Sequence, residues 1–261
     1  MKLPRVLRRL AFGALGFALA TAGLAAEIRV MTSGGFTAPY QELTPQFEKA
    51  TGHKVITSYG ASQGGAPDSI PSRLERGEPV DIVILAAPAL DGLIKQGKVA
   101  AGSRVDLVRS SIGMAVKSGA PKPDISTVEA LKKTLLEAKS IAYSASASGT
   151  YLANDLFPRL GIWEQIKGKS KRIESERVGT IVARGDAEIG FQQVSELLPI
   201  AGIDFAGTLP KDAQQVTIFS SGFATGSKEP EAARALVKFF TSPEAAATIS
   251  KFGLEPLSAR W

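Results

Sequence analysis

The chain has 261 residues, of which 44% are hydrophobic and 21% charged, and its formal net charge is +6. This is the composition of a soluble globular protein that is long enough for one large or two small domains. Cysteine is absent and His53 is the only histidine, which argues against disulfides, thiolate chemistry, a histidine-based zinc site and a Ser-His-Asp triad.

The first 22 residues have the pattern of a secretory signal peptide. Four basic residues precede an apolar run over 10–19, and Ala20-Thr21-Ala22 fits the small-x-small cleavage rule. We expect cleavage after Ala22, with Ala25 and Ala26 as alternatives, and therefore a periplasmic protein. The apolar run is too short for a stable membrane span. Removal of the signal peptide, with its four basic residues, leaves a net charge of +2. No basic run with interleaved aromatic residues follows, so no nucleic-acid partner is expected.

The remaining chain alternates strand and helix patterns. In the first part, strands are expected from Glu27 to the turn at Ser33-Gly34-Gly35, over 54–59 and over 80–85, and helices over 39–50, 67–77 and 88–96. This spacing favours βαβ units and a mostly parallel sheet.

The rhythm changes after residue 105. Two short strands are expected over 106–108 and 112–116, followed by helices over 127–138, 150–160 and 175–184, strands over 140–143 and 187–191, a strand-like segment over 215–225, and helices over 230–240 and 243–252. We interpret this as two α/β lobes, one made of 27–108 and 222–261 and the other of 109–221. A cleft between two such lobes is a common place for a small ligand.

Four short segments could each bind an anion, because each combines hydroxyls or a cation with glycine near the start of a helix. They are Ser33-Gly34-Gly35, Ser62-Gln63-Gly64-Gly65, the stretch with Ser148-Gly149, and Glu176-Arg177-Val178-Gly179. Helix N-termini favour anions, and glycine lets the backbone approach a ligand closely. Any one segment also fits an ordinary turn, but four at corresponding places predict an anion pocket beyond the strand ends.

Other polar residues remain open between two interpretations. Gln192-Gln193 follow a strand and fit either a carboxylate partner or a polar strand end. Tyr59 and Tyr151 flank two of the turns and fit packing better than chemistry. Glu196 is expected in a short helix with its carboxylate exposed.

The chain resembles the periplasmic solute-binding proteins of ABC importers, and within them the molybdate-binding group. The markers are Ser33, the Ser62 turn, Ser148-Gly149-Thr150-Tyr151 and the stretch 178–190. The resemblance implies the two-lobed α/β fold of type II periplasmic binding proteins, which close around an oxyanion with neutral donors. It assigns the two hydroxyls of lobe one to Ser33 and Ser62, and a backbone donor of lobe two to Ser148.

Two positions depart from the molybdate-binding pattern. Arg177 stands where a small apolar residue is typical, and Gln193 where a tyrosine is typical. A guanidinium suits carboxylates, so the departures indicate an organic polycarboxylate.

The opening 31–36 and the segment 190–199 also resemble the aconitate isomerases. That resemblance implies an isomerase that interconverts trans- and cis-aconitate by an allylic proton shift in the cleft, without a metal or organic cofactor. Ser33, Gly34, Ser62, Gln63, Ser148, Gly149, Arg177 and Gln193 would bind the tricarboxylate. The proton-transferring base stays open, with Tyr151 as the candidate.

A binding protein that delivers molybdate or an organic polycarboxylate to an ABC importer is the alternative. Such a protein needs no base, and the sequence offers no obvious one. An interaction module without a small ligand is disfavoured by the repeated glycine turns.

Overall fold

The computed structural model describes residues 25–258. The expected signal peptide, apart from the alternative cleavage sites at Ala25 and Ala26, lies outside the described residues. Within the described range, no helix combines the length and apolar character needed to span a bilayer.

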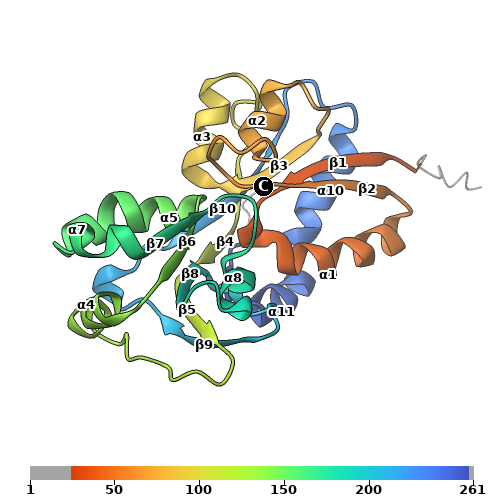
Figure 1. Ribbon diagram of the computed structural model, residues 1–261. Coiled ribbons are helices and arrows are strands. Elements are labelled where there is room, and N and C mark those ends of the chain that lie inside the picture. Colours follow the sequence, from red (N-terminus) through yellow and green to blue (C-terminus); the bar gives the residue numbers. More distant parts are fainter. Residues whose placement is uncertain (1–24, 259–261) are drawn as a thin grey trace, which may run out of the picture.

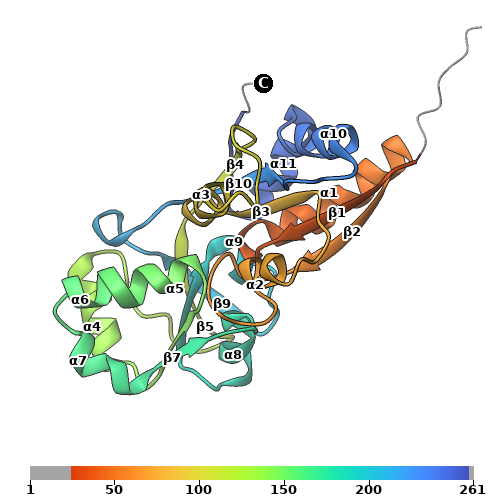
Figure 2. The same cartoon turned by 90° about the horizontal axis from the view of Figure 1, so that it is seen from above.

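The chain forms two sheets that lie in separate lobes (Figures 1 and 2). The first has the order β11-β4-β10-β3-β1-β2, with the bounds β11 (Leu254–Pro256), β4 (Val105–Ser110), β10 (Thr217–Phe223), β3 (Ile82–Ala86), β1 (Glu27–Thr32) and β2 (Lys54–Tyr59). The second has the order β7-β6-β8-β5-β9, with β7 (Ser170–Ile173), β6 (Ile141–Ser144), β8 (Ile189–Gln193), β5 (Ile112–Lys117) and β9 (Ile203–Thr208). The two-lobed α/β fold is therefore as expected.

The expectation of a mostly parallel sheet is wrong. β1 runs parallel to β2 and β3, and β6 runs parallel to β7 and β8. However, β10 is antiparallel to both of its neighbours, and β5 is antiparallel to β8 and β9. Both sheets are mixed because the segments that pass between the lobes add strands of the opposite direction.

The passages between the lobes fall at the ends of two adjacent antiparallel strands. β4 ends at Ser110 and β5 of the second sheet begins at Ile112, while the return enters the first sheet with β10 at Thr217. The expected divisions at 108/109 and 221/222 fall inside β4 and β10, because β4 continues to Ser110 and β10 spans Thr217–Phe223.

Helix α1 (Gly34–Thr51) begins five residues before the expected start at Pro39 and ends at Gly52, whose φ of 77° is easy for glycine. Proline has no N–H, so the carbonyl of Gly35 loses its usual helical partner at Pro39. This carbonyl instead accepts a 2.7 Å hydrogen bond from Ser195 Oγ of the other lobe. Pro39, which the sequence pattern placed at the helix start, thus lies inside the helix and frees a carbonyl for a contact between the lobes.

The other helices lie around these sheets (Figures 1 and 2). They are α2 (Ile70–Glu75), α3 (Ala87–Lys95), α4 (Val128–Glu137), α5 (Ala147–Tyr151), a π-helix (Leu152–Leu156), α6 (Phe157–Arg159), α7 (Trp163–Ile166), α8 (Val178–Arg184), α9 (Val194–Leu197), α10 (Pro230–Phe240) and α11 (Pro243–Lys251), with 3₁₀ turns at Lys167–Lys169 and Lys211–Ala213.

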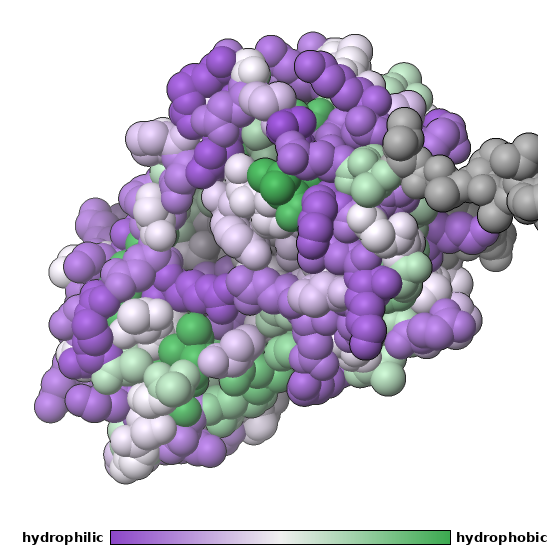
Figure 3. Space-filling view, turned by 90° about the vertical axis from the view of Figure 1, so that its right-hand side faces the viewer, coloured by the Kyte–Doolittle hydropathy of each residue, from purple (hydrophilic) through white to green (hydrophobic). Residues whose placement is uncertain are grey.

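Each lobe has its own apolar core. In the first, Phe36 and Tyr40 of α1 pack against Phe240 of α10 with ring centroids 5.4 and 5.6 Å apart. In the second, Phe157 packs against Tyr143 and Phe191 of the sheet. The face seen in Figure 3 is mostly hydrophilic, with its hydrophobic residues in smaller patches. Separate cores let the interface between the lobes carry polar residues.

Candidate functional site

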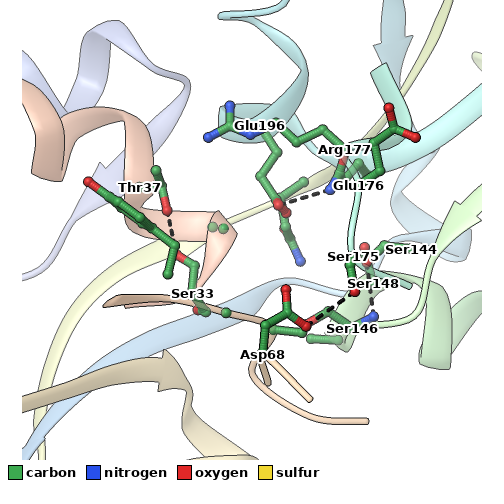
Figure 4. A pocket seen from close by; sticks show the side chains of 18 of the residues that line it. Ser33, Thr37, Asp68, Ser144, Ser146, Ser148, Ser175, Glu176, Arg177 and Glu196 are labelled. Carbon is green, nitrogen blue, oxygen red and sulfur yellow. Dashed lines mark hydrogen bonds between the residues drawn. The ribbon is translucent and has the colours of Figure 1, made fainter. Parts of the chain in front are cut away.

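A cavity of about 270 Å³ lies between the lobes. The first lobe contributes the start of α1, including Ser33 and Gly34, and the second contributes Ser148, Arg177 and Glu196 (Figure 4). These segments meet because strands of both sheets end at the cleft, as the rule for open α/β sheets predicts.

The α1 wall of the cavity presents an unsatisfied hydroxyl. Ser33 is the N-cap of α1, and its N–H donates to Ile84 O at 2.8 Å. Its Oγ is buried and has no hydrogen-bond partner among residues 25–258, and Thr37 Oγ1 donates to its carbonyl at 3.0 Å. A buried hydroxyl without a partner costs free energy, so a ligand oxygen in the cavity would satisfy it. The start of an 18-residue helix at this point adds a field that favours an anion.

Five of the sequence-predicted binding residues line this cavity. They are Ser33, Gly34, Ser148, Arg177 and Gln193. Arg177 is the N-cap residue of α8 and the cationic side chain among the lining residues. The cavity therefore combines one guanidinium with hydroxyls and helix N-termini, which can bind an anion with several oxygen atoms, although four acidic residues also line it: Asp68, Glu174, Glu176 and Glu196.

Ser62 and Gln63 lie in the loop that bridges the two lobes and do not line the cavity. Ser62 is fully buried, its Oγ accepts from Ala86 N at 3.0 Å, and its own N–H donates to Ser146 Oγ at 3.2 Å. Gln63 Nε2 donates to Thr150 Oγ1 at 2.8 Å. In this structure both residues hold the lobes together across the cleft.

Gly149 serves close packing. A Cβ at this position would lie 1.6 Å from the backbone oxygen of Ser144, so only glycine lets α5 pack against the end of β6. The neighbouring Ser148 reaches the cavity wall because of this close approach.

Tyr151 lies in a different place from the one that the sequence suggested for a base. Its hydroxyl donates to Ala213 O at 3.0 Å and accepts from Arg159 at 2.9 Å. It lines a separate groove of about 530 Å³, and partial burial raises its pKa from the ordinary value of 10.0. Tyr151 therefore does not reach the cavity that holds Ser33 and Arg177.

Gln193 sits where the chain passes between the lobes. Its Oε1 accepts from Ser110 Oγ at 2.7 Å, and its Nε2 donates to Thr217 Oγ1 at 3.1 Å. Ser110 ends β4 and Thr217 begins β10, so one amide joins both connecting strands. Both polar atoms of the amide are occupied by protein partners.

The expectation that Glu196 is exposed is wrong. It lies in α9 with only 9% of its surface accessible, and its carboxyl group lines the cavity (Figure 4). Its Oε1 accepts from Gln192 Nε2 at 2.9 Å, and Arg177 lies near enough for its charge to act on the carboxyl group. Burial raises the pKa of Glu196 to about 7, although Arg177 and the Gln192 hydrogen bond act in the opposite direction.

One signal in the sequence could have found Glu196. Glu196 follows the strand-end pair Gln192-Gln193 within four residues, so a short turn there can bring its carboxyl group back to the same edge of the sheet.

No group of three or more His, Cys, Asp or Glu side chains suited to hold a metal ion occurs in the described range 25–258.

Comparison with known proteins places the chain in a family. Residues 28–255 match the model of the family described as bacterial extracellular solute-binding proteins. The chain belongs to that family. The resemblance inferred from the sequence motifs is thereby confirmed.

Two curated relatives are informative. The chain is 47% identical to a protein named aconitate isomerase from Pseudomonas sp., over 98% of this chain and 99% of the relative. It is 31% identical to the molybdate-binding protein of Azotobacter vinelandii, over 90% of this chain and 92% of the relative.

Solved structures agree on the fold. The molybdate-binding protein of A. vinelandii superposes with a TM-score of 0.69 at 22% identity, covering 87% of this chain and 98% of the other. The sulfate-binding protein of Mycobacterium tuberculosis gives 0.70 at 20% identity, with 89% and 87% covered. These likenesses establish the two-lobed fold of periplasmic binding proteins.

Proposed function

We propose that this protein is an aconitate isomerase that interconverts trans- and cis-aconitate in the cleft between its lobes. The observation that carries this proposal is the 47% identity, over nearly the full length of both chains, to the Pseudomonas protein of that name. The same family membership, together with the signal-like first 22 residues, supports export to the periplasm.

The chemistry of the cavity supports a tricarboxylate as ligand. The Arg177 guanidinium can pair with a carboxylate through two parallel hydrogen bonds. Ser33 Oγ, which has no partner in the described part of the chain, can donate to a second carboxylate, and the N-termini of α1 and α5 add neutral donors at Gly34 and Ser148. Gln193 lines the same cavity, but its amide already serves Ser110 and Thr217.

The proposed reaction moves one proton and one double bond. A base removes a proton from the methylene group, the electron pair delocalises over three carbons and their carboxylates, and a proton returns at the far carbon. Fixed donors around the carboxylates would hold the reacting carbons in place and stabilise the developing charge. The scheme asks for no metal or organic cofactor.

A binding protein for an importer is the second candidate. The unsatisfied Ser33 hydroxyl and the 31% identity to a molybdate-binding protein favour it, because a hydroxyl at a helix N-terminus suits any oxyanion. The presence of Arg177 in the cavity favours carboxylates over molybdate.

The deciding experiment incubates the purified mature protein with trans-aconitate and follows cis-aconitate by chromatography. We expect conversion until the two isomers reach equilibrium. Absence of turnover, together with tight molybdate binding in calorimetry, would replace the isomerase by the binding protein.

Replacing Arg177 by alanine tests the carboxylate anchor. A charged hydrogen bond contributes about 1.5–3 kcal/mol, so we expect the KM for trans-aconitate to rise about 10- to 100-fold. Steady-state kinetics measure this, with Arg109→Ala as control because Arg109 is exposed and, within the described range, forms a single 3.4 Å ion pair, with Glu255. An unchanged KM in Arg177→Ala would remove Arg177 from the substrate site.

A further inference from the structure

Glu196 is a buried acidic residue whose presence is not explained by binding of a tricarboxylate in the cavity. Its carboxyl group lies in the wall of a cavity proposed to hold a tricarboxylate, yet a carboxylate there repels the ligand. A buried ionisable group is costly to keep unless it is fully paired. Its one hydrogen bond among the described residues comes from the neutral amide of Gln192.

The first lobe provides the space for this carboxyl group. A Cβ built on Gly34 would lie 1.8 Å from Glu196 Oε1 and 2.6 Å from its carboxyl carbon. The acid of one lobe therefore occupies the place of a side chain at the start of α1 in the other. Ser195 fixes α9 there, since its Oγ donates to Gly35 O at 2.7 Å.

Gln192 fixes the orientation of the carboxyl group. Its Oε1 accepts the N–H of Val178 at 3.0 Å, so its Nε2 must face Glu196, to which it donates at 2.9 Å. Both Gln192 and Glu196 are buried, and they stand four residues apart at the junction of β8 and α9. The amide holds one carboxylate oxygen and leaves the other available to a ligand in the cavity.

We propose that Glu196 is the catalytic residue that moves the proton in this isomerisation, with Gln192 as its positioning residue. The inference rests on the proposed function. The ionised carboxylate takes a proton from the substrate methylene group as that C–H bond breaks, and the electron pair passes into the allyl system. The protonated Glu196 then gives the proton to the far carbon as the new C–H bond forms, which restores the carboxylate.

The charges around Glu196 agree with this role. Arg177 is the charged group that acts on it from the α8 side, α1 presents Gly34, and β8 presents the neutral Gln192. Asp68, Glu174 and Glu176 line the same cavity. A base near neutral pKa is ionised in a useful fraction and still strong enough to accept a proton. Arg177 would also stabilise the negative charge that passes to the substrate when Glu196 is protonated.

The test compares wild-type protein with Glu196→Gln, which keeps the shape and can still accept the hydrogen bond from Gln192. We expect a loss of kcat of about 100- to 10,000-fold, while trans-aconitate binding in calorimetry is retained or tightened because a like charge is gone. Proton NMR should show the signals of trans-aconitate converting into those of cis-aconitate with the wild type and almost no conversion with the variant. Glu137→Gln is the control, since Glu137 is exposed at the end of α4.

A pH series and a second variant complete the test. The wild-type kcat/KM should rise with pH through about 7, and Glu196→Asp should recover part of the activity that Glu196→Gln lacks. Turnover by a folded Glu196→Gln within tenfold of the wild type would overturn the role of Glu196 and leave the isomerase intact. If Glu196→Gln does not fold, a wild-type profile that is flat around pH 7 would overturn it. Failure of the wild type itself to convert trans-aconitate would overturn the proposed function instead.

Discussion

Arg177 and Glu196 bring opposite charges to the wall of one small cavity, and they differ in how far water reaches them. Arg177 is half-buried, whereas Glu196 is almost completely buried. Burial raises the pKa of Glu196, and the charge of Arg177 only partly offsets that effect. At the residue scale, the site therefore keeps a carboxyl group close to its titration point near neutral pH.

This arrangement predicts a cost in stability. Glu196 has an ordinary pKa of 4.5 and a folded-state pKa of about 7, so the folded state holds the proton more tightly than the unfolded state. Stability should fall as pH rises from about 4.5 to above 7, by about 3 kcal/mol from this group. Glu196→Gln lacks this loss, so its free energy of unfolding in urea should exceed that of the wild type increasingly between pH 5 and pH 8. A difference between the two proteins that is independent of pH would contradict the raised pKa.

At the element scale, the site depends on the places where segments approach closely. The N-terminus of α1 lies against Glu196 because residue 34 has no side chain, and the Gly35 carbonyl is available to Ser195 because Pro39 has no N–H. Helix α5 presents Ser148 because Gly149 lies against the backbone of β6.

Gly149→Ala tests the last of these contacts. Its methyl group would lie 1.6 Å from Ser144 O, so helix α5 must move, and we expect a loss of about 3 kcal/mol in the free energy of unfolding. Gly92→Ala in α3 is the matched control, because its Cβ would meet no atom within 4 Å and alanine favours a helix by up to about 1 kcal/mol. Urea denaturation measures both, and equal stability of the two variants would contradict the packing role.

At the scale of the whole molecule, the cleft depends on two connecting strands and one bridging loop. Gln193 ties the end of β4 to the start of β10, and the loop around Ser62 and Gln63 contacts the second lobe. Ser175 Oγ adds a 3.2 Å hydrogen bond to Asp68 across the cleft. These contacts set the distance between Ser33 on one lobe and Arg177 on the other.

Gln193→Leu should destabilise the protein. It would leave the buried hydroxyls of Ser110 and Thr217 without their partner, which costs about 2 kcal/mol. Gln165→Leu is the control, since Gln165 is exposed in α7. A variant with unchanged stability but a KM raised as much as in Arg177→Ala would show instead that the amide of Gln193 binds substrate.

Much of the fold was predictable because local patterns coincide with it. The βα rhythm, the helix at 230–240 and the glycine-rich turns are consequences of periodicity and turn chemistry, and the two-lobed α/β fold followed from them. Strand direction was not predictable, since β10 is antiparallel only because of where the chain returns from the second lobe.

The sequence by itself predicted an anion pocket from Ser33, Gly34, Ser148 and Arg177, since hydroxyls, glycine and a cation at helix starts are local features, and the structure places these residues around one cavity. Only the tertiary structure decided which ionisable side chain lies in that cavity and could transfer the proton. Tyr151 lies beside a separate groove, and Glu196 is brought against Gly34, which is far from it in sequence. Burial and long-range proximity set the chemistry of an ionisable side chain, and neither is encoded in the residues next to it.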